Sequence, residues 1–202
     1  MQNPLKCYID FKVPASYLAL KPTIQLIQDY GLTPRWLPYP CRPSPSTSSI
    51  TTNSGAAQAS ENETRGETHR RIRAVAQQKT HALYAKAQQT TMNFPAEPGE
   101  SRLALAAMLN VEHNMLEFIQ AAYKAYWEDQ EDLNSPMVVT RLLVDTNNDP
   151  KGLSESYLDQ LDTHQLNCEE SGIMDAPTFC INEHIFVGRE HFPWIRQELD
   201  DS

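Results

Sequence analysis

The sequence has little basic charge for its length and no long apolar run. Its 202 residues carry 17 Lys and Arg against 26 Asp and Glu, which gives a formal net charge of −9 at pH 7. This balance argues against nucleic-acid and anionic-membrane partners, because binding to phosphate depends on a concentrated basic field. No apolar run approaches the roughly 20 residues that span a bilayer. The first residues also lack the basic and then apolar segments of a secretory signal. We therefore expect a cytoplasmic globular protein.

Cysteines are few and widely spaced. The chain has four, none of them in Cys-x-x-Cys spacing, and its six histidines do not cluster near them. Structural zinc sites draw their four ligands from closely paired Cys and His residues. We expect no metal site and four reduced, mostly structural thiols, with Cys180 packed in the core.

The first forty residues predict a strand, a helix and a second strand. Apolar residues alternate over residues 5–10, as in a short strand. A helical apolar face follows and stops at Gly31, while Pro22 interrupts it and predicts a kink or a restart. Residues 35–39 form the second strand. A strand, a helix and a strand that follow one another this closely predict a right-handed unit with parallel strands.

The middle of the chain predicts a loop followed by helices. Residues 41–64 are rich in Ser and Thr and have too little apolar surface to order, so we interpret them as a long flexible loop. Residues 65–167 carry helical spacing and form the predicted insertion. Its helices are expected at residues 66–90, 101–127, 135–144 and 154–165. Four apolar residues are expected to face inward from the first of these: Ile72, Val75, Leu83 and Ala87.

The end of the chain returns to β-structure. Two short apolar runs, residues 178–181 and 185–187, flank a polar turn and predict a hairpin. An amphipathic helix starting near Phe192 follows. The chain is therefore expected to form one α/β domain, from residues 1–40 and 168–202, that is split by the helical insertion.

Three segments resemble the DsbA branch of the thioredoxin superfamily. Residues 10–19 (DFKVPASYLA) resemble the D-F-x-S-P-Y-x-Y-L-A signature of 2-hydroxychromene-2-carboxylate isomerases and their DsbA-like relatives. Residues 172–179 (GIMDAPTF) resemble the family segment G-V-x-G-V-P-T-F, whose proline is cis. Residues 187–190 (VGRE) resemble the W-G-x-D turn that follows it.

The resemblance implies a thioredoxin-like fold with a helical insertion and a ligand groove. In redox relatives, two cysteines occupy the first and fourth positions of the motif at the start of the first helix. In isomerases and kappa-class glutathione transferases, a serine at the first position binds the glutathione thiolate. Glutathione is thus the implied cofactor, and its implied contacts are Val13, Pro14, Ala176, Pro177, Arg189 and Glu190.

The sequence departs from the family at the reactive position. Val13 replaces the nucleophilic Cys or thiolate-binding Ser, so dithiol exchange at this site is chemically impossible. Asp175 stands where the family has a glycine. Two candidate catalytic residues remain. Ser16 could orient a thiolate or only cap the helix, and Lys12 could hold a substrate carboxylate or only be solvated.

These residues leave three functions open. The first is a glutathione-dependent isomerase or transferase-like enzyme acting on a small substrate. The second is a catalytically degenerate DsbA-like module that binds a small or peptide-like ligand. The third, a thiol-disulfide oxidoreductase, is implied by family name only. A homodimer is also left open.

Overall fold

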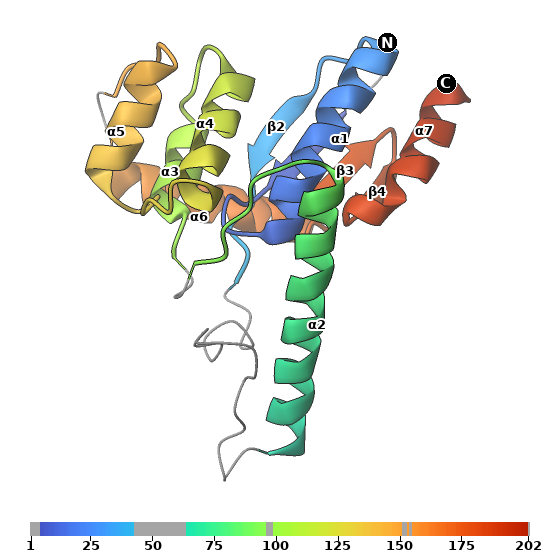
Figure 1. Cartoon of the computed structure of the whole chain (residues 1–202). Helices are drawn as coiled ribbons and strands as arrows, with labels where there is room; N and C mark the ends of the chain where they lie inside the picture. The colour runs from blue at the N-terminus through green and yellow to red at the C-terminus, as the bar shows by residue number, and fades with distance from the viewer. Residues whose placement is uncertain (1–4, 43–63, 96–98, 151–152, 154, 202) are drawn as a thin grey trace.

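A mixed four-stranded sheet forms the centre of the molecule (Figure 1). The computed structural model of the chain describes residues 5–42, 64–95, 99–150, 153 and 155–201. The strands lie in the order β2-β1-β3-β4, with β1 and β2 parallel and β3 antiparallel to both β1 and β4. Their bounds are Lys6–Ile9 for β1, Arg35–Pro38 for β2, Thr178–Ile181 for β3 and His184–Val187 for β4. The predicted parallel unit, hairpin and α/β class are confirmed, whereas residues 43–63 of the predicted loop lie outside the described residues.

Of the kink or restart predicted at Pro22, the restart is wrong, because helix α1 (Pro14–Tyr30) continues through it as one helix. A proline has no N–H, and the carbonyl four residues earlier therefore loses its helical donor. That carbonyl belongs to Leu18, and Gln88 Nε2 donates a hydrogen bond to it at 3.1 Å. The predicted stop at Gly31 is confirmed, because Gly31 adopts a left-handed conformation (φ 61°) and ends the helix.

Helices cover both faces of the sheet. Alternate residues of β1 explain the division, because Cys7 and Ile9 belong to the main apolar core and Tyr8 to a second cluster on the other face. Helices α1 and α7 (Phe192–Asp200) contribute to the main core, while α6 (Glu155–Glu170) packs Cys168 against Tyr8. The boundary expected between residues 167 and 168 therefore falls inside one continuous helix.

Helix α2 (Arg65–Ala87) projects as a long rod away from the sheet (Figure 1). The prediction that this helix turns Ile72 and Leu83 inward is wrong, because Ile72 is 55% and Leu83 is 64% exposed. Only Ala74 and Ala85 are buried. A capping box, in which Thr64 and Glu67 exchange hydrogen bonds, stabilises the start of the helix, and its other end lies against α1 through Gln88.

The single helix expected over residues 101–127 is two helices. Helix α3 (Arg102–Met108) and helix α4 (Met115–Trp127) are separated by a loop. Asn148 holds that loop from outside, since its Oδ1 accepts hydrogen bonds from the Glu112 and His113 amides and its Nδ2 donates to the His113 carbonyl. The expected helix at 135–144 is confirmed as α5 (Pro136–Asp145).

Trp127 joins the helical insertion to the sheet. Its indole Nε1 donates a buried hydrogen bond of 2.8 Å to the Phe11 carbonyl, just before α1. The ring stacks on Tyr17 of α1, with 5.9 Å between centroids and 3° between planes. A side chain from the end of α4 thereby fixes the start of α1.

We expect Trp127→Phe to lower the free energy of unfolding by about 1–3 kcal/mol. The change keeps an aromatic ring but leaves the buried Phe11 carbonyl without its donor. Urea unfolding measures the loss, and Trp194→Phe is the matched control. Trp194 is 61% exposed, so its change should stay within about 0.5 kcal/mol. Equal effects at the two positions would show that the buried hydrogen bond contributes nothing.

Candidate functional site

The residues predicted to form the site gather at one edge of the sheet. The carboxyl ends of the parallel strands β1 and β2 lie at this edge. Because β3 is antiparallel and pairs Thr178 with Tyr8, its amino end lies there too. The carboxyl end of β4 completes the edge, where the Gly188 amide donates to the Pro177 carbonyl at 2.8 Å. The start of α1, the cis-proline loop and the turn after β4 are therefore neighbours.

The buried carboxylate of Asp10 connects three segments at this edge. Its Oδ1 accepts hydrogen bonds from the Lys12 amide at 3.2 Å and from the Ser101 hydroxyl at 2.6 Å. Its Oδ2 accepts from the Cys41 amide at 2.8 Å. Burial raises the pKa of Asp10, while these donors and the nearby Lys12 charge lower it, and burial has the larger effect. One side chain thus links β1, the start of α3 and the end of β2.

Cys41 and Asp175 extend this network to the cis-proline loop. The Cys41 thiol lies 3.5 Å from Asp175 Oδ1. Burial, and then the Asp10 and Asp175 carboxylates, raise the pKa of Cys41. The thiolate is the nucleophilic form of cysteine, and these neighbours disfavour it. Cys41 is therefore poorly suited to thiol exchange.

Helix α1 begins beside this network without a reactive side chain. Val13 is the extended residue before the helix (φ −86°, ψ 117°), and Pro14 occupies the first helical position. Both are half-buried. The start of a helix carries positive partial charge, which stabilises an anion placed there. Pro14 has no N–H, and the Val13 and Ser16 amides donate to the carbonyls of Asp10 and Val13. The helix dipole therefore favours an anion here, but Val13 and Pro14 offer it no hydrogen bond.

The two predicted catalytic residues lie close to the site but are already engaged. Ser16 is 1% exposed, and its hydroxyl accepts a 3.4 Å hydrogen bond from the Asp10 amide. The Lys12 ammonium forms a 2.7 Å ion pair with Glu100. This geometry gives Ser16 a structural role and requires a substrate carboxylate to compete with Glu100. The catalytic roles of Ser16 and Lys12 stay predictions.

The Ala176–Pro177 peptide bond is cis, as predicted. The Ala176 amide, which would pair with a bound peptide-like ligand, donates instead to Asp175 Oδ1 at 2.8 Å. Asp175 is exposed on the surface, so its side chain can rotate away. The Asp175 carboxylate thus occupies the backbone donor that precedes the cis-proline.

Arg189 and Glu190 follow β4 in the short helix η1 (Arg189–His191). The Arg189 guanidinium lies 4.0 Å above the Tyr84 ring of α2, a cation–π contact. The Glu190 carboxylate folds back toward Gly188, and a Cβ at Gly188 would lie 2.5 Å from Glu190 Oε2. The two residues flank the cis-proline loop, but their side chains turn toward α2 and Gly188. Their predicted contact with a γ-glutamyl group stays a prediction.

Three residues of this site were missed by sequence reasoning as functional groups: Asp10, Cys41 and Asp175. Asp10 and Asp175 lie inside the two segments that resemble the family. For Asp175, the replacement of the family's glycine could have indicated a functional role. Cys41 had no such signal, because its place beside Asp10 depends on how β2 pairs with β1.

The described part of the chain offers no metal cluster and no membrane helix. No group of three or more His, Cys, Asp or Glu residues is positioned to hold a metal within these residues. All four cysteines are free thiols, and Cys180 is half-buried rather than fully in the core. Among the helices that the structure describes, none combines the length and apolar character needed to cross a bilayer.

We expect Asp10→Asn to change how stability depends on pH. Since burial raises the pKa of folded Asp10, its contribution is fully present below the usual aspartate pKa of about 4 and is lost as pH rises through the raised value. The wild type should therefore lose stability relative to Asp10→Asn as pH rises. Urea unfolding at a series of pH values from about 3 to 8 measures the difference.

Asp29→Asn is the control of opposite sign. Hydrogen bonds from Gln25 and Arg196 lower the pKa of Asp29, so its contribution is lost as pH falls. If the Asp10 and Asp29 variants show the same pH trend, the direction assigned to Asp10 is wrong.

Comparisons with known proteins agree with this geometry. The chain matches the DSBA-like thioredoxin domain over residues 5–200. Its structure is similar to that of a 2-hydroxychromene-2-carboxylate isomerase, with a TM-score of 0.75 at 16% sequence identity, covering 98% of this chain and 95% of that one. No curated protein matches the sequence significantly.

The structure is also similar to the cytosolic disulfide reductase DsbM from Pseudomonas aeruginosa. The TM-score is 0.63 at 12% identity, covering 99% of this chain and 100% of that one. A second structure of DsbM, with GSH, gives a TM-score of 0.57 at 13% identity, covering 98% of this chain and 100% of that one. At such identities these likenesses establish the fold alone. With the domain match over nearly the whole sequence, they show that the chain belongs to the DsbA-like thioredoxin domain family.

Proposed function

We propose that this DsbA-family protein binds glutathione, or a similar small peptide-like thiol, at the sheet edge and acts on a small substrate as an isomerase- or transferase-like enzyme. The proposal is supported by the cis Ala176–Pro177 bond, which lies at the same end of the sheet as the start of α1, in a chain without a cysteine at position 13 or 16. A groove of this form can hold a ligand thiolate but cannot exchange a disulfide through its own dithiol.

The residues present fit glutathione at one end of the groove. A thiolate would lie at the amide end of α1, next to Val13 and Pro14, where the helix dipole lowers the energy of an anion. Glutathione supplies, when bound, a thiol that can add to an electrophilic carbon of a small substrate. Ser16 would act only through the Asp10 amide to which it is bonded, and Lys12 would orient an anionic substrate if released from Glu100.

At the cis-proline loop, the fit requires one rotation. The Ala176 amide must leave the Asp175 carboxylate before it can donate to the backbone of a ligand. Beyond the loop, Glu190 is the acidic residue that could bind the ligand's amino group, once its carboxylate turns away from Gly188, and Arg189 is held over Tyr84. These contacts therefore form only when Asp175 and Glu190 both move.

A second candidate is a binding module that has lost its chemistry. Two observations favour it: Val13 supplies no hydroxyl at the reactive position, and Asp175 occupies the donor of the cis-proline loop. Such a module would keep the groove for a peptide-like ligand and would not use the thiol of glutathione. Titration with glutathione separates the two functions.

We expect millimolar glutathione to bind the wild type, and Val13→Ser to raise that affinity about tenfold. A serine hydroxyl at this position can donate a charge-assisted hydrogen bond to the thiolate, which is worth roughly one factor of ten. Isothermal titration calorimetry measures both affinities. Ala15→Ser is the matched control, because it adds the same hydroxyl two residues away. No binding at millimolar concentration would overturn the enzymatic proposal, and an equal effect of both serines would place the cofactor elsewhere.

We expect Asp175→Gly to raise glutathione affinity severalfold, because it frees the Ala176 amide. Asp175→Asn is the control that separates occlusion from charge. The asparagine side-chain oxygen can still accept a hydrogen bond from the Ala176 amide. This variant therefore removes the charge but keeps the Ala176 amide occupied. If Asp175→Asn binds glutathione as tightly as Asp175→Gly in the same titration, then the wild type binds weakly because its carboxylate repels an anionic ligand, and the occupied Ala176 amide is not the cause.

A further inference from the structure

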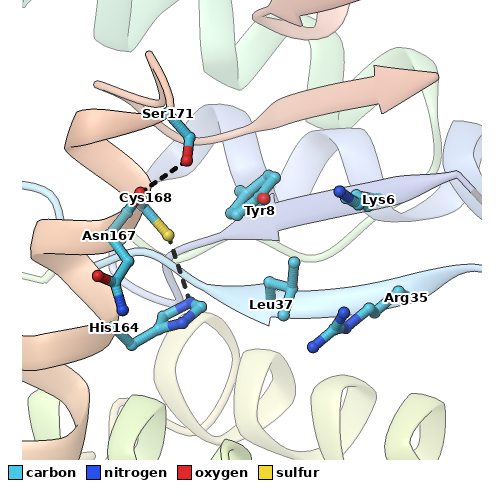
Figure 2. A pocket seen from close by; sticks show the side chains of 8 residues that line it. All are labelled: Lys6, Tyr8, Arg35, Leu37, His164, Asn167, Cys168 and Ser171. Atoms are coloured by element: carbon cyan, nitrogen blue, oxygen red, sulfur yellow. Dashed lines mark hydrogen bonds between the residues drawn. The ribbon is translucent and has the colours of Figure 1, made fainter. Parts of the chain in front are cut away.

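A pocket lies on the opposite face of the sheet from α1, under helix α6 (Figure 2). It has a volume of about 150 Å³. Lys6 and Tyr8 reach it from β1, Arg35 from β2, and His164 and Cys168 from α6. The candidate site described above lies beyond the carboxyl ends of β1 and β2, whereas this pocket lies on the face of the sheet that carries Lys6 and Tyr8. It is therefore a separate site.

Two cations line this pocket at neighbouring positions. Lys6 and Arg35 are register partners in the parallel pairing of β1 with β2, and both side chains line the cavity. No acidic residue is among the lining residues. Within the part of the chain that the structure describes, no carboxylate forms a salt bridge with either cation. Two unneutralised cations side by side are notable in a protein with a net charge of −9.

Two cations at paired positions provide complementary charge for an anion. Lys6 and Arg35 are both exposed, so solvent screens part of the repulsion between them. An oxyanion between the two side chains would remove that repulsion and accept hydrogen bonds from both. The guanidinium of Arg35 matches the two oxygens of a phosphate or carboxylate group, and Lys6 adds a second positive charge.

The inner end of the pocket limits the ligand to a small one. Cys168 is buried there, and its thiol lies 3.4 Å from His164 Nε2. Tyr8 lies between this pair and the two cations (Figure 2). A cavity of about 150 Å³ is below the roughly 300–1,000 Å³ of sites for drug-sized ligands. The space suits an anionic group attached to only a few further atoms.

We propose that this pocket binds a small molecule carrying a phosphate or carboxylate group, held between Lys6 and Arg35 with its body over Tyr8. The site goes beyond the proposed function, because it shares no residue with the groove at the start of α1. Its ligand could be a substrate-sized metabolite or an inorganic anion, and both share the same oxyanion chemistry.

Titration of the full chain with inorganic phosphate, followed by amide NMR shifts, tests the proposal. We expect saturable shifts at Lys6, Arg35 and Cys168. Sodium acetate in a parallel titration distinguishes a carboxylate ligand from a phosphate ligand, and saturation by either anion supports the site. Sodium chloride at matched ionic strength is the blank. Shifts that do not saturate, or that chloride reproduces, would overturn the proposal.

Variants then assign the binding to the two cations. Lys6→Met and Arg35→Met should each weaken binding about three- to fivefold, as expected for exposed charge pairs. Lys6→Arg keeps the charge and should keep the affinity. Lys79→Met removes the same charge from an exposed position on α2 and should also keep it. Equal weakening by Lys79→Met would show that only net charge matters, which rejects the site. Phosphate binding is independent of glutathione, so failure here leaves the proposed function standing.

Discussion

The buried carboxylate of Asp10 is the interaction on which the site depends. It lies at the end of β1 and holds the backbone at Lys12 and Cys41 and the hydroxyl of Ser101 by hydrogen bonds. A buried carboxylate without such partners would be strongly destabilising, so these contacts must form together. The start of α1, the end of β2 and the first residue before α3 are fixed by the same atoms. The helical insertion is thereby tied to the carboxyl end of β1.

This carboxylate also sets the chemistry that the groove can support. Redox-active relatives need a stabilised thiolate at the start of the first helix, and this chain places Val13 there. The nearest thiol, Cys41, stands between Asp10 and Asp175, which together with burial raise its pKa. The negative charge around the Cys41 thiol and the absence of a nucleophile at the start of α1 both disfavour thiol-disulfide exchange by this chain's own cysteines. The fold is that of the DsbA-like family, while burial and the local charges disfavour a thiolate at the chain's own Cys41.

Much of the fold could be predicted because it follows from local pattern. Alternation marked the strands, Gly31 marked the end of α1, and the segment around Pro177 identified the cis-proline loop. The errors have tertiary causes. Asn148, distant in sequence, holds the loop that divides the helix expected over 101–127. The burial of Ser16 and the approach of Cys41 to Asp10 depend on packing and strand pairing, which a single sequence does not display.

The contact between Gln88 and the Leu18 carbonyl couples two distant positions of the chain. Pro22 creates a carbonyl without a helical donor, and Gln88 is acceptable as that donor only because α2 ends beside α1. Without Gln88, Pro22 would leave the Leu18 carbonyl without a hydrogen-bond donor. With a residue other than proline at position 22, the backbone N–H of that residue would bond to Leu18, and the Gln88 side-chain amide would not be needed there. Positions 22 and 88 should consequently vary as a pair among related proteins. Because Gln88 directly follows α2, the same pair also helps to set the orientation of that helix.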